Sequence, residues 1–272
     1  MPAPTTQEAR PPRKRRRDPF GYSPRFFERM KPFGEFLYRR YWRVTCDGIT
    51  NVPAKGPVLI IGNHSGAIPL DGAMIAMALE LDHPHPRRLR FLYDRFVADM
   101  PFMGEFYDRL GAVVASYDNA RKLLQRREAV GIFPEGVEGV AKGIRQRYEV
   151  QRFRSGFVRL SLELRVPIVP VAVVGAEETY PVIGKWKAAG LFAKMLNVPY
   201  VPVTPFFPLF GVLGMVPLPT RWHIRFGPPL RFDHARTGAA PPRRVINELT
   251  EGVRRQIQGM VHALLAERDS VF

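Results

Sequence analysis

The sequence holds a single cysteine, Cys46, among its 272 residues. One cysteine excludes a disulfide bond within the chain and a zinc site built from several cysteines. The start of the sequence also lacks the pattern of a secretory signal peptide. We therefore expect the protein to act in the reducing environment of the cytoplasm.

Long apolar runs are missing too. A helix that crosses a bilayer needs about 18 or more consecutive apolar residues, and no stretch of the chain offers them without interruption. The nearest candidate is the uncharged segment 198–219, "VPYVPVTPFFPLFGVLGMVPLP", which contains six prolines. Proline at that density excludes a regular helix.

Acidic residues are few, with 25 Asp and Glu against 41 Lys and Arg, and the net charge is +16. Residues 1–20 are rich in proline and arginine, which predicts a disordered basic tail. Residues 21–272 still carry a net charge of +12, because the tail contributes six basic and two acidic side chains. Their length and apolar content predict one folded domain, and their basic charge favours an anionic partner.

The spacing of apolar residues predicts an α/β domain. Residues 24–41 have aromatic and basic side chains at helical spacing, which indicates an amphipathic helix that either lies on its own domain or anchors the protein in a membrane interface. Further helices are expected at 69–81, 118–128 and 242–268, and strands at 41–52, 57–62, 88–93, 111–116, 129–134, 166–175 and 222–227. This alternation predicts a mixed, partly parallel sheet flanked by helices, with a helix at each end of the domain.

The segment "GNHSGAIPLDG" (62–72) follows an apolar strand and leads into a helix. His64 therefore lies at the carboxyl end of a strand, where α/β folds place functional residues. An imidazole there suits a general base, and Asp71 could hold the ring and stabilise the imidazolium. A histidine flanked by glycines is by itself more typical of a surface loop, so the assignment depends on further signals.

Three more blocks follow in order. Segment 101–113 contains a proline, a glycine and "LGAV", "IFPEG" (132–136) ends a strand with Glu135 and Gly136, and "VPIVPVAV" (166–173) brackets a strand with Pro167 and Pro170. Together with "NHS…D", this order resembles the four-block pattern of the glycerolipid acyltransferases, the family that includes 1-acylglycerol-3-phosphate acyltransferases. The resemblance extends over about residues 41–230.

The resemblance implies transfer of a fatty acyl group from a thioester, either acyl-CoA or acyl carrier protein, to the hydroxyl of a lipid. It implies that His64 is the general base and Asp71 its partner, with no metal, no cofactor besides the acyl donor and no covalent enzyme intermediate. The other residues carried over are Glu135 and Gly136 in the acceptor-binding block, and Pro167 and Pro170 in the block linked to acyl-donor binding or to the shape of the site.

The first block departs from the family pattern. The family usually has four residues between the histidine and the aspartate, whereas six intervene here. A seven-residue step along a continuous helix rises about 10 Å, which is too far for a hydrogen bond. Pro69 suits the first turn of a helix, so residues 64–68 can form a loop that folds back. We therefore predict that Asp71 reaches the ring of His64.

The second block departs as well, because Ser116 stands where a basic residue is usual. This ending is similar to the branch that contains diacylglycerol acyltransferases and plant phytyl ester synthases, whose acceptors are neutral alcohols. The acceptor stays open between a phosphate-bearing lipid, such as a lysophospholipid, and a neutral one, diacylglycerol or a fatty alcohol. We favour the phosphorylated acceptor, since most of the broader family is of that kind.

Four arginines follow the third block in "GIRQRYEVQRFRSG": Arg145, Arg147, Arg152 and Arg154. They could hold a phosphate of the lipid or of CoA through charge-assisted hydrogen bonds, although a solvated basic face explains them equally well. Arg154 is the strongest candidate for substrate binding, because the family has a basic residue shortly before a glycine there.

Three other interpretations carry less weight: a metal site, a nucleic-acid-binding protein and a lipid hydrolase. His83 and His85 in "HPHP" lack a third metal ligand nearby and are expected in a surface turn. A nucleic-acid-binding protein would explain "RKRRR" (13–17) and the basic charge, but the body has no recognisable nucleic-acid motif. An anionic membrane surface explains the same charge, so we expect peripheral or monotopic attachment at the cytoplasmic face. A lipid hydrolase would need a serine nucleophile, which no segment provides.

Overall fold

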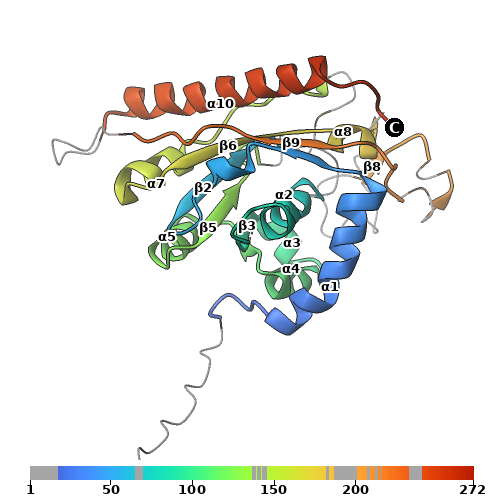
Figure 1. Cartoon of the computed structure of the whole chain (residues 1–272), viewed down its shortest axis with the longest axis horizontal. Coiled ribbons are helices and arrows are strands. Elements are labelled where there is room, and N and C mark those ends of the chain that lie inside the picture. The colour runs from blue at the N-terminus through green and yellow to red at the C-terminus, as the bar shows by residue number, and fades with distance from the viewer. Residues whose placement is uncertain are drawn as a thin grey trace, which may run out of the picture.

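Strands and helices alternate along the chain in the computed structural model, which describes residues 18–64, 70–136, 139, 142, 146–181, 184–186, 201–206, 209–211, 214, 216–232 and 241–272. Within these ranges seven strands form one sheet in the order β1-β9-β6-β2-β5-β3-β4 (Figure 1). Their bounds are β1 Thr45–Asp47, β2 Val58–Gly62, β3 Leu89–Tyr93, β4 Val113–Val114, β5 Ala129–Ile132, β6 Ile168–Val174 and β9 His223–Phe226. Two short strands, β7 (Gly184–Trp186) and β8 (Val201–Val203), form a separate antiparallel pair.

The sheet is parallel except where β9 meets β6. β2 lies between β5 and β6 and runs parallel to both, with Ile61 opposite Ile132 on one side and Pro170 on the other. β9 pairs antiparallel with β6 and parallel with β1. All five residues of β2 are buried, as expected for a parallel strand that is covered on both faces. The sequence correctly predicted a mixed, partly parallel sheet.

Helices cover both faces of the sheet. One core joins Leu59 and Ile61 of β2 to α5 (Tyr117–Gln125), α7 (Gly156–Leu164) and α10 (Arg243–Ala266). The other joins Val58 and Ile60 to α2 (Leu70–Leu81) and to the end of the N-terminal helical segment. Alternate residues of a strand point to opposite faces, so β2 contributes to both cores. Figure 1 shows α10 along one face of the sheet and α1, α2 and α4 on the other side.

The N-terminal helix is interrupted near its end. The sequence predicts one helix over residues 24–41, whereas α1 covers Pro24–Phe36 and is followed by a π-helical turn at Leu37–Tyr41. Ser23 caps α1 by accepting a hydrogen bond from the backbone N–H of Phe26, at 3.4 Å. The wider turn lets Tyr38 and the following Trp42 enter the core, where both are almost fully buried.

Several elements differ from the sequence-based prediction. The expected strand 41–52 is shortened to Thr45–Asp47, because Gly48 adopts φ +65° and starts a 3-10 turn. Four helices were not predicted: α3 (Arg95–Ala98), α4 (Met103–Leu110), α7 and α8 (Ala176–Thr179). All four have nine residues or fewer, which gives too few turns for a clear helical period.

The packed part of the chain includes residues that precede α1. Asp18 forms an ion pair with the fully buried Arg90 at 2.8 Å, and Arg90 also contacts Glu128 at 2.9 Å. The guanidinium of Arg90 lowers the pKa of Asp18, although burial of the carboxyl opposes this. Residues 1–17 of the predicted basic tail lie outside the described residues. Among the helices that the structure describes, none has the length and apolar content needed to cross a membrane.

Gly48 offers a test of how β1 joins β9. A Cβ atom added there would lie 2.2 Å from the carbonyl oxygen of Phe226, and the φ of +65° is unfavourable for any L side chain. We expect Gly48→Ala to lower the free energy of unfolding by about 2–4 kcal/mol, measured by urea denaturation.

Gly252→Ala is the matched control for this substitution. Gly252 lies on an exposed face of α10, where nothing lies within 4 Å of an added Cβ. Alanine favours helix over glycine, so this change should stabilise the protein by up to about 1 kcal/mol. Equal effects of the two substitutions would contradict the assigned role of Gly48.

Candidate active site

The carboxyl ends of three parallel neighbours meet at one edge of the sheet. Asn63 and His64 follow β2, Glu135 follows β5, and Glu177 follows β6. Because adjacent parallel strands end at the same edge, side chains far apart in the sequence come within hydrogen-bonding distance there. The side chains that meet there include His64, which follows β2 as the sequence predicted.

His64 and Asp71 are in contact despite the seven-residue step between them. Nδ1 of His64 lies 2.7 Å from Oδ2 of Asp71, and both side chains are buried, that of Asp71 completely. Asp71 lies in the first turn of α2, and its Oδ1 accepts the backbone N–H of Gly72. A carboxylate can only accept, so Nδ1 donates and Nε2 is left as the basic nitrogen. The contact that the sequence predicted is present; residues 65–69, which join the pair, lie outside the described residues.

Two contacts fix the position of the imidazole and its backbone. The ring of His64 stacks on Phe133, with centroids 4.3 Å apart and planes inclined by 14°. The preceding Asn63 extends the sheet with its side chain: its amide donates to the carbonyl of Val173 at 3.0 Å and accepts the N–H of Val173 at 2.8 Å. Asn63 was missed in the sequence, although it stands in "NHS" directly before the histidine.

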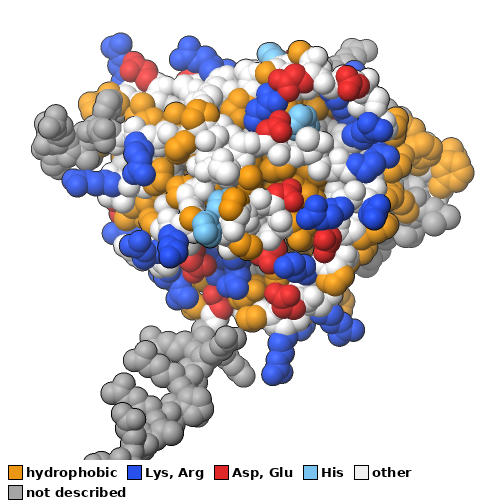
Figure 2. All heavy atoms as spheres, viewed as in Figure 1, with side chains coloured by type: hydrophobic (Ala, Val, Ile, Leu, Met, Phe, Trp, Pro, Cys, Tyr) orange, Lys and Arg blue, Asp and Glu red, His pale blue; other side chains and the backbone are white. Residues whose placement is uncertain are grey.

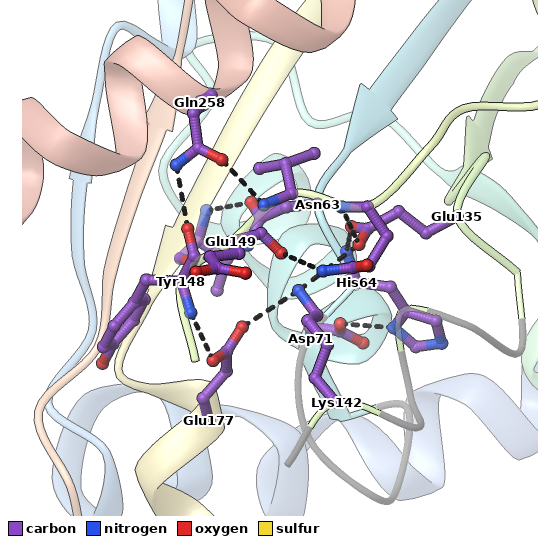
Figure 3. Close-up of polar contacts among 12 residues, drawn as sticks. Asn63, His64, Asp71, Glu135, Lys142, Tyr148, Glu149, Glu177 and Gln258 are labelled. Carbon is purple, nitrogen blue, oxygen red and sulfur yellow. Dashed lines mark hydrogen bonds and ion pairs between the residues drawn. The ribbon is translucent and has the colours of Figure 1, made fainter. Parts of the chain in front are cut away.

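Glu135 supports the site from within (Figure 3). Its Oε1 accepts the backbone N–H of His64 at 2.7 Å, and its Oε2 accepts the N–H of Gln151 at 2.8 Å and lies 3.3 Å from Nζ of Lys142. The side chain is fully buried, and it is not among the residues that line the cavity described below. In the structure Glu135 therefore supports the site from inside, and its predicted role in substrate binding stays a prediction.

A second buried carboxylate continues this network. Lys142 Nζ lies 3.1 Å from Oε1 of Glu177, and Oε2 of Glu177 accepts the N–H of Tyr148 at 2.6 Å. Burial raises the pKa of Glu177, while Lys142 and the N–H of Tyr148 oppose the rise. Sequence reasoning missed Lys142 and Glu177, because neither belongs to a periodic pattern and the contact between them joins residues 35 positions apart.

An apolar cavity of about 610 Å³ opens beside His64. Its walls come from α1, α2, α3, α4, the ends of β3 and β5, and α7, and most of the lining side chains are apolar. Tyr107 of α4 also lines it; burial raises the pKa of Tyr107 to about 12, and the negative charge of Asp71 adds to the effect. A cavity of this size and polarity suits a hydrocarbon chain.

Two predicted substrate-binding residues lie on this cavity. Gly136 adopts φ +59°, and a Cβ added to it would lie 3.5 Å from Cζ of Arg154. Arg154 is exposed and lines the cavity together with His64, while its backbone N–H is held by the carbonyl of Pro134 at 3.1 Å. Arg147 and Arg152 are exposed and do not line the cavity, and Arg145 lies outside the described residues.

Pro167 and Pro170 do not reach the cavity. The carbonyl of Pro167 accepts the N–H of Leu59 at 3.0 Å. Leu59 lies five residues before His64, which corresponds to about 16 Å along an extended strand. Pro170 is buried within β6, and its carbonyl accepts the N–H of Gly227, one residue beyond the end of β9. Both prolines therefore act on β6, Pro167 directly before it and Pro170 within it. Their predicted part in acyl-donor binding or in the shape of the site stays a prediction.

Ser116 and His83 also have structural roles. Ser116 lines the cavity, and its Oγ caps α5 by accepting the N–H of Asn119 at 3.0 Å. His83 was expected in a surface turn but is buried, with Nε2 2.9 Å from the carbonyl of Val52 and Nδ1 3.0 Å from the N–H of His85.

Among the described residues no group of three or more His, Cys, Asp or Glu side chains is placed to hold a metal ion.

The fold and the cavity define an α/β enzyme with its ligand site at the carboxyl edge of the sheet. Residues 43–174 match the family described as Acyltransferase. An uncharacterized protein of Mycobacterium leprae is 42% identical over 94% of this chain and 69% of its own length, and one of Mycobacterium tuberculosis (strain H37Rv) is 40% identical over 94% and 71%. The chain belongs to the acyltransferase family and is an acyltransferase.

More distant relatives carry more specific names. The "DGAT1/2-independent enzyme synthesizing storage lipids" of Bos taurus is 25% identical over 79% of this chain and 58% of its own length. The crystal structure of the 1-acyl-sn-glycerophosphate acyltransferase PlsC from Thermotoga maritima superposes with a TM-score of 0.54 and 16% identity, covering 90% of this chain and 81% of that one. At that identity the superposition shows a shared fold.

Proposed function

We propose that this acyltransferase moves a fatty acyl group from acyl-CoA or acyl carrier protein to the hydroxyl of a lysophospholipid or glycerol phosphate lipid. The observation that carries the proposal is the position of His64, hydrogen-bonded to Asp71 behind it, on the wall of an apolar cavity that Arg154 also lines. The cavity offers room for the acyl chain, the imidazole offers a base, and the guanidinium offers a partner for a phosphate.

The chemistry follows from the direction of the His64–Asp71 hydrogen bond. Nε2 of His64 accepts the proton of the lipid hydroxyl while the hydroxyl oxygen attacks the thioester carbonyl carbon. The tetrahedral intermediate then collapses, the carbon–sulfur bond breaks, and the imidazolium returns the proton to the departing thiolate. Asp71 stabilises the imidazolium and holds the ring in one tautomer. The products are the esterified lipid and the free thiol of the carrier.

Loss of the base should stop the reaction without unfolding the protein. We expect His64→Ala to lower kcat by 10²-fold or more, and Asp71→Asn to lower it strongly as well, because the ring loses its tautomer and its counter-charge. Transfer is measured with labelled acyl-CoA. Asp269→Asn, an exposed aspartate near the C-terminus, is the matched control and should keep normal turnover. Near-normal turnover in His64→Ala would end the assignment.

Arg154 supports a phosphate-bearing acceptor. The two basic side chains on the described cavity wall are Lys31 and Arg154. Lys31 is already paired with Glu80 at 2.7 Å, whereas no ion pair of Arg154 is found within the described part of the chain. A neutral acceptor is the second candidate, since the cavity is apolar, Ser116 lines it, and relatives are named for storage-lipid and phytyl ester synthesis.

The two acceptors predict different effects of Arg154→Ala. With a lysophospholipid, the acceptor KM should rise about tenfold or more, because a charge-assisted hydrogen bond is worth about 1.5–3 kcal/mol. With diacylglycerol or a fatty alcohol, only the KM for acyl-CoA should change. Arg152→Ala, an exposed neighbour off the cavity, is the matched control. Transfer to diacylglycerol with no activity on any lyso-lipid would overturn the phosphorylated acceptor.

Exposed aromatic side chains support attachment to a membrane surface. Phe33 and Phe36 of α1 are 57% and 50% exposed, and Phe210 is 58% exposed. α1 and the segment that holds Phe210 lie at the same end of the molecule. The hydroxyl of Tyr41, shortly after α1, donates to the carbonyl of Pro217, shortly after Phe210, at 2.6 Å. Figure 2 shows hydrophobic side chains gathered at the edge where α1 and β8 lie, with basic side chains distributed over the drawn face.

This arrangement favours a peripheral protein at the cytoplasmic face of a membrane. Exposed aromatic side chains can enter the interface while basic ones are attracted to anionic lipids. Phe33 both lines the cavity and is exposed, so a lipid can pass between the bilayer and the site along α1. The same basic charge needs no nucleic acid to explain it.

Binding to anionic vesicles should weaken with salt but persist, because screening removes only the electrostatic part. We expect the double substitution Phe36→Ser and Phe210→Ser to lower the affinity that persists at high salt by about thirtyfold, since about 1 kcal/mol is lost for each half-exposed ring. Co-sedimentation measures both effects. Binding that disappears entirely at high salt in the unmodified protein would remove the insertion claim.

A further inference from the structure

A buried lysine joins the two carboxylates beneath the site (Figure 3). Nζ of Lys142 lies 3.3 Å from Oε2 of Glu135 and 3.1 Å from Oε1 of Glu177. The three side chains are 5%, 0% and 7% exposed. Charges buried to this degree carry a large desolvation cost, and a buried ion pair often stabilises a fold no more than apolar packing would. The arrangement therefore calls for an explanation besides stability.

Each carboxylate holds backbone groups of the site. Glu135 accepts the N–H of His64 at 2.7 Å with one oxygen and the N–H of Gln151 at 2.8 Å with the other. Glu177 accepts the N–H of Tyr148 at 2.6 Å. The ammonium group thus connects the end of β6 to the segment that carries His64, through a chain of direct contacts.

The same network holds the segment that leads to Arg154. Gln258 of α10 accepts the N–H of Val150 at 2.7 Å and donates to the carbonyl of Tyr148 at 2.9 Å. Residues 148–151 are therefore fixed from three directions, by Glu177, Gln258 and Glu135. Lys142 lies at the centre of these contacts and does not line the cavity.

We propose that Lys142 is a positioning residue for acyl transfer, which holds Glu135 so that its carboxylate fixes the backbone of His64. Without the ammonium, two buried carboxylates face each other unbalanced, and Glu135 turns away from the His64 N–H. The imidazole then loses its alignment with Asp71 and with the substrate in the cavity. The effect of Lys142 on kcat rests on the proposed function, whereas its effect on the position of His64 does not.

The test is Lys142→Met, which keeps the length of the side chain and removes its charge. We expect kcat per folded molecule to fall tenfold or more, while the KM for acyl-CoA changes less than twofold, because Lys142 does not line the cavity. Hydrogen exchange at the His64 amide, followed by mass spectrometry, should accelerate tenfold or more. The exchange readout needs no substrate, so it tests the inference even if the proposed reaction is wrong.

A double-mutant cycle shows whether Lys142 acts through Glu135. An amide accepts with one oxygen only, so Glu135→Gln cannot bind both backbone N–H groups and should itself lower kcat. Adding Lys142→Met to Glu135→Gln should then reduce kcat by less than twofold more. Effects that multiply in the double variant would overturn the proposal.

Arg90→Met is the matched control. Arg90 is also a fully buried cation between two carboxylates, Asp18 and Glu128, and it lies away from His64. Its loss should lower the melting temperature yet leave kcat and the exchange of the His64 amide unchanged. An equal fall of kcat in both variants would show a general effect of destabilisation and overturn the proposal.

A milder variant decides the question if Lys142→Met does not fold. In Glu177→Gln the single side-chain oxygen can still accept the N–H of Tyr148. The NH₂ group then faces the ammonium of Lys142 and displaces it, because two donors cannot bond each other. We expect kcat to fall threefold or more. Normal kcat and normal exchange at His64 in a folded Lys142 or Glu177 variant would remove the inference. Absence of acyl transfer in the unmodified protein would instead remove the proposed function.

Discussion

The parallel pairing of β2 with β5 and β6 is the constraint on which the site depends. Strands that run parallel in adjacent positions end at the same edge, and the register places Ile61 beside Ile132 and Pro170. His64 and Glu135 are 71 residues apart in the sequence, yet their contact follows directly from that register. A slip of one residue would turn every side chain of β2 to the other face and separate them.

The site has two sides with different chemistry. Beneath His64, Glu135 is paired with Lys142 and accepts backbone N–H groups, while Asn63 bonds the backbone N–H and carbonyl of Val173. Above it, the cavity wall is mainly apolar and contains few charged groups, among them Arg154. Buried polar groups that are satisfied internally do not compete for a substrate, and they hold the ring in a fixed geometry. An apolar wall strengthens the few polar contacts that a substrate makes with it.

The N-terminal helix connects the cavity to the surface. α1 lines the cavity with Phe27 and Met30 and exposes Phe36, and the π-helical turn after it brings Trp42 into the core. Trp42 stacks on Trp222 with ring centroids 4.8 Å apart, so the helix is tied to the strand end at β9. The helix packs on its own domain, which was one of the two roles that the sequence left open, and it also exposes aromatic side chains.

Local patterns in the sequence determined the elements with strong periods, namely β2, α2, β6 and α10. The order of the four blocks and their resemblance to a family pointed to His64 with Asp71, and the same resemblance pointed to Gly136 and Arg154. The tertiary structure alone brought Glu135, Lys142 and Glu177 into contact, and it placed Pro167 and Pro170 away from the cavity. The reason is physical: hydrophobic spacing reports which face of an element is buried, whereas contacts between distant segments depend on strand order and register, which that spacing does not encode.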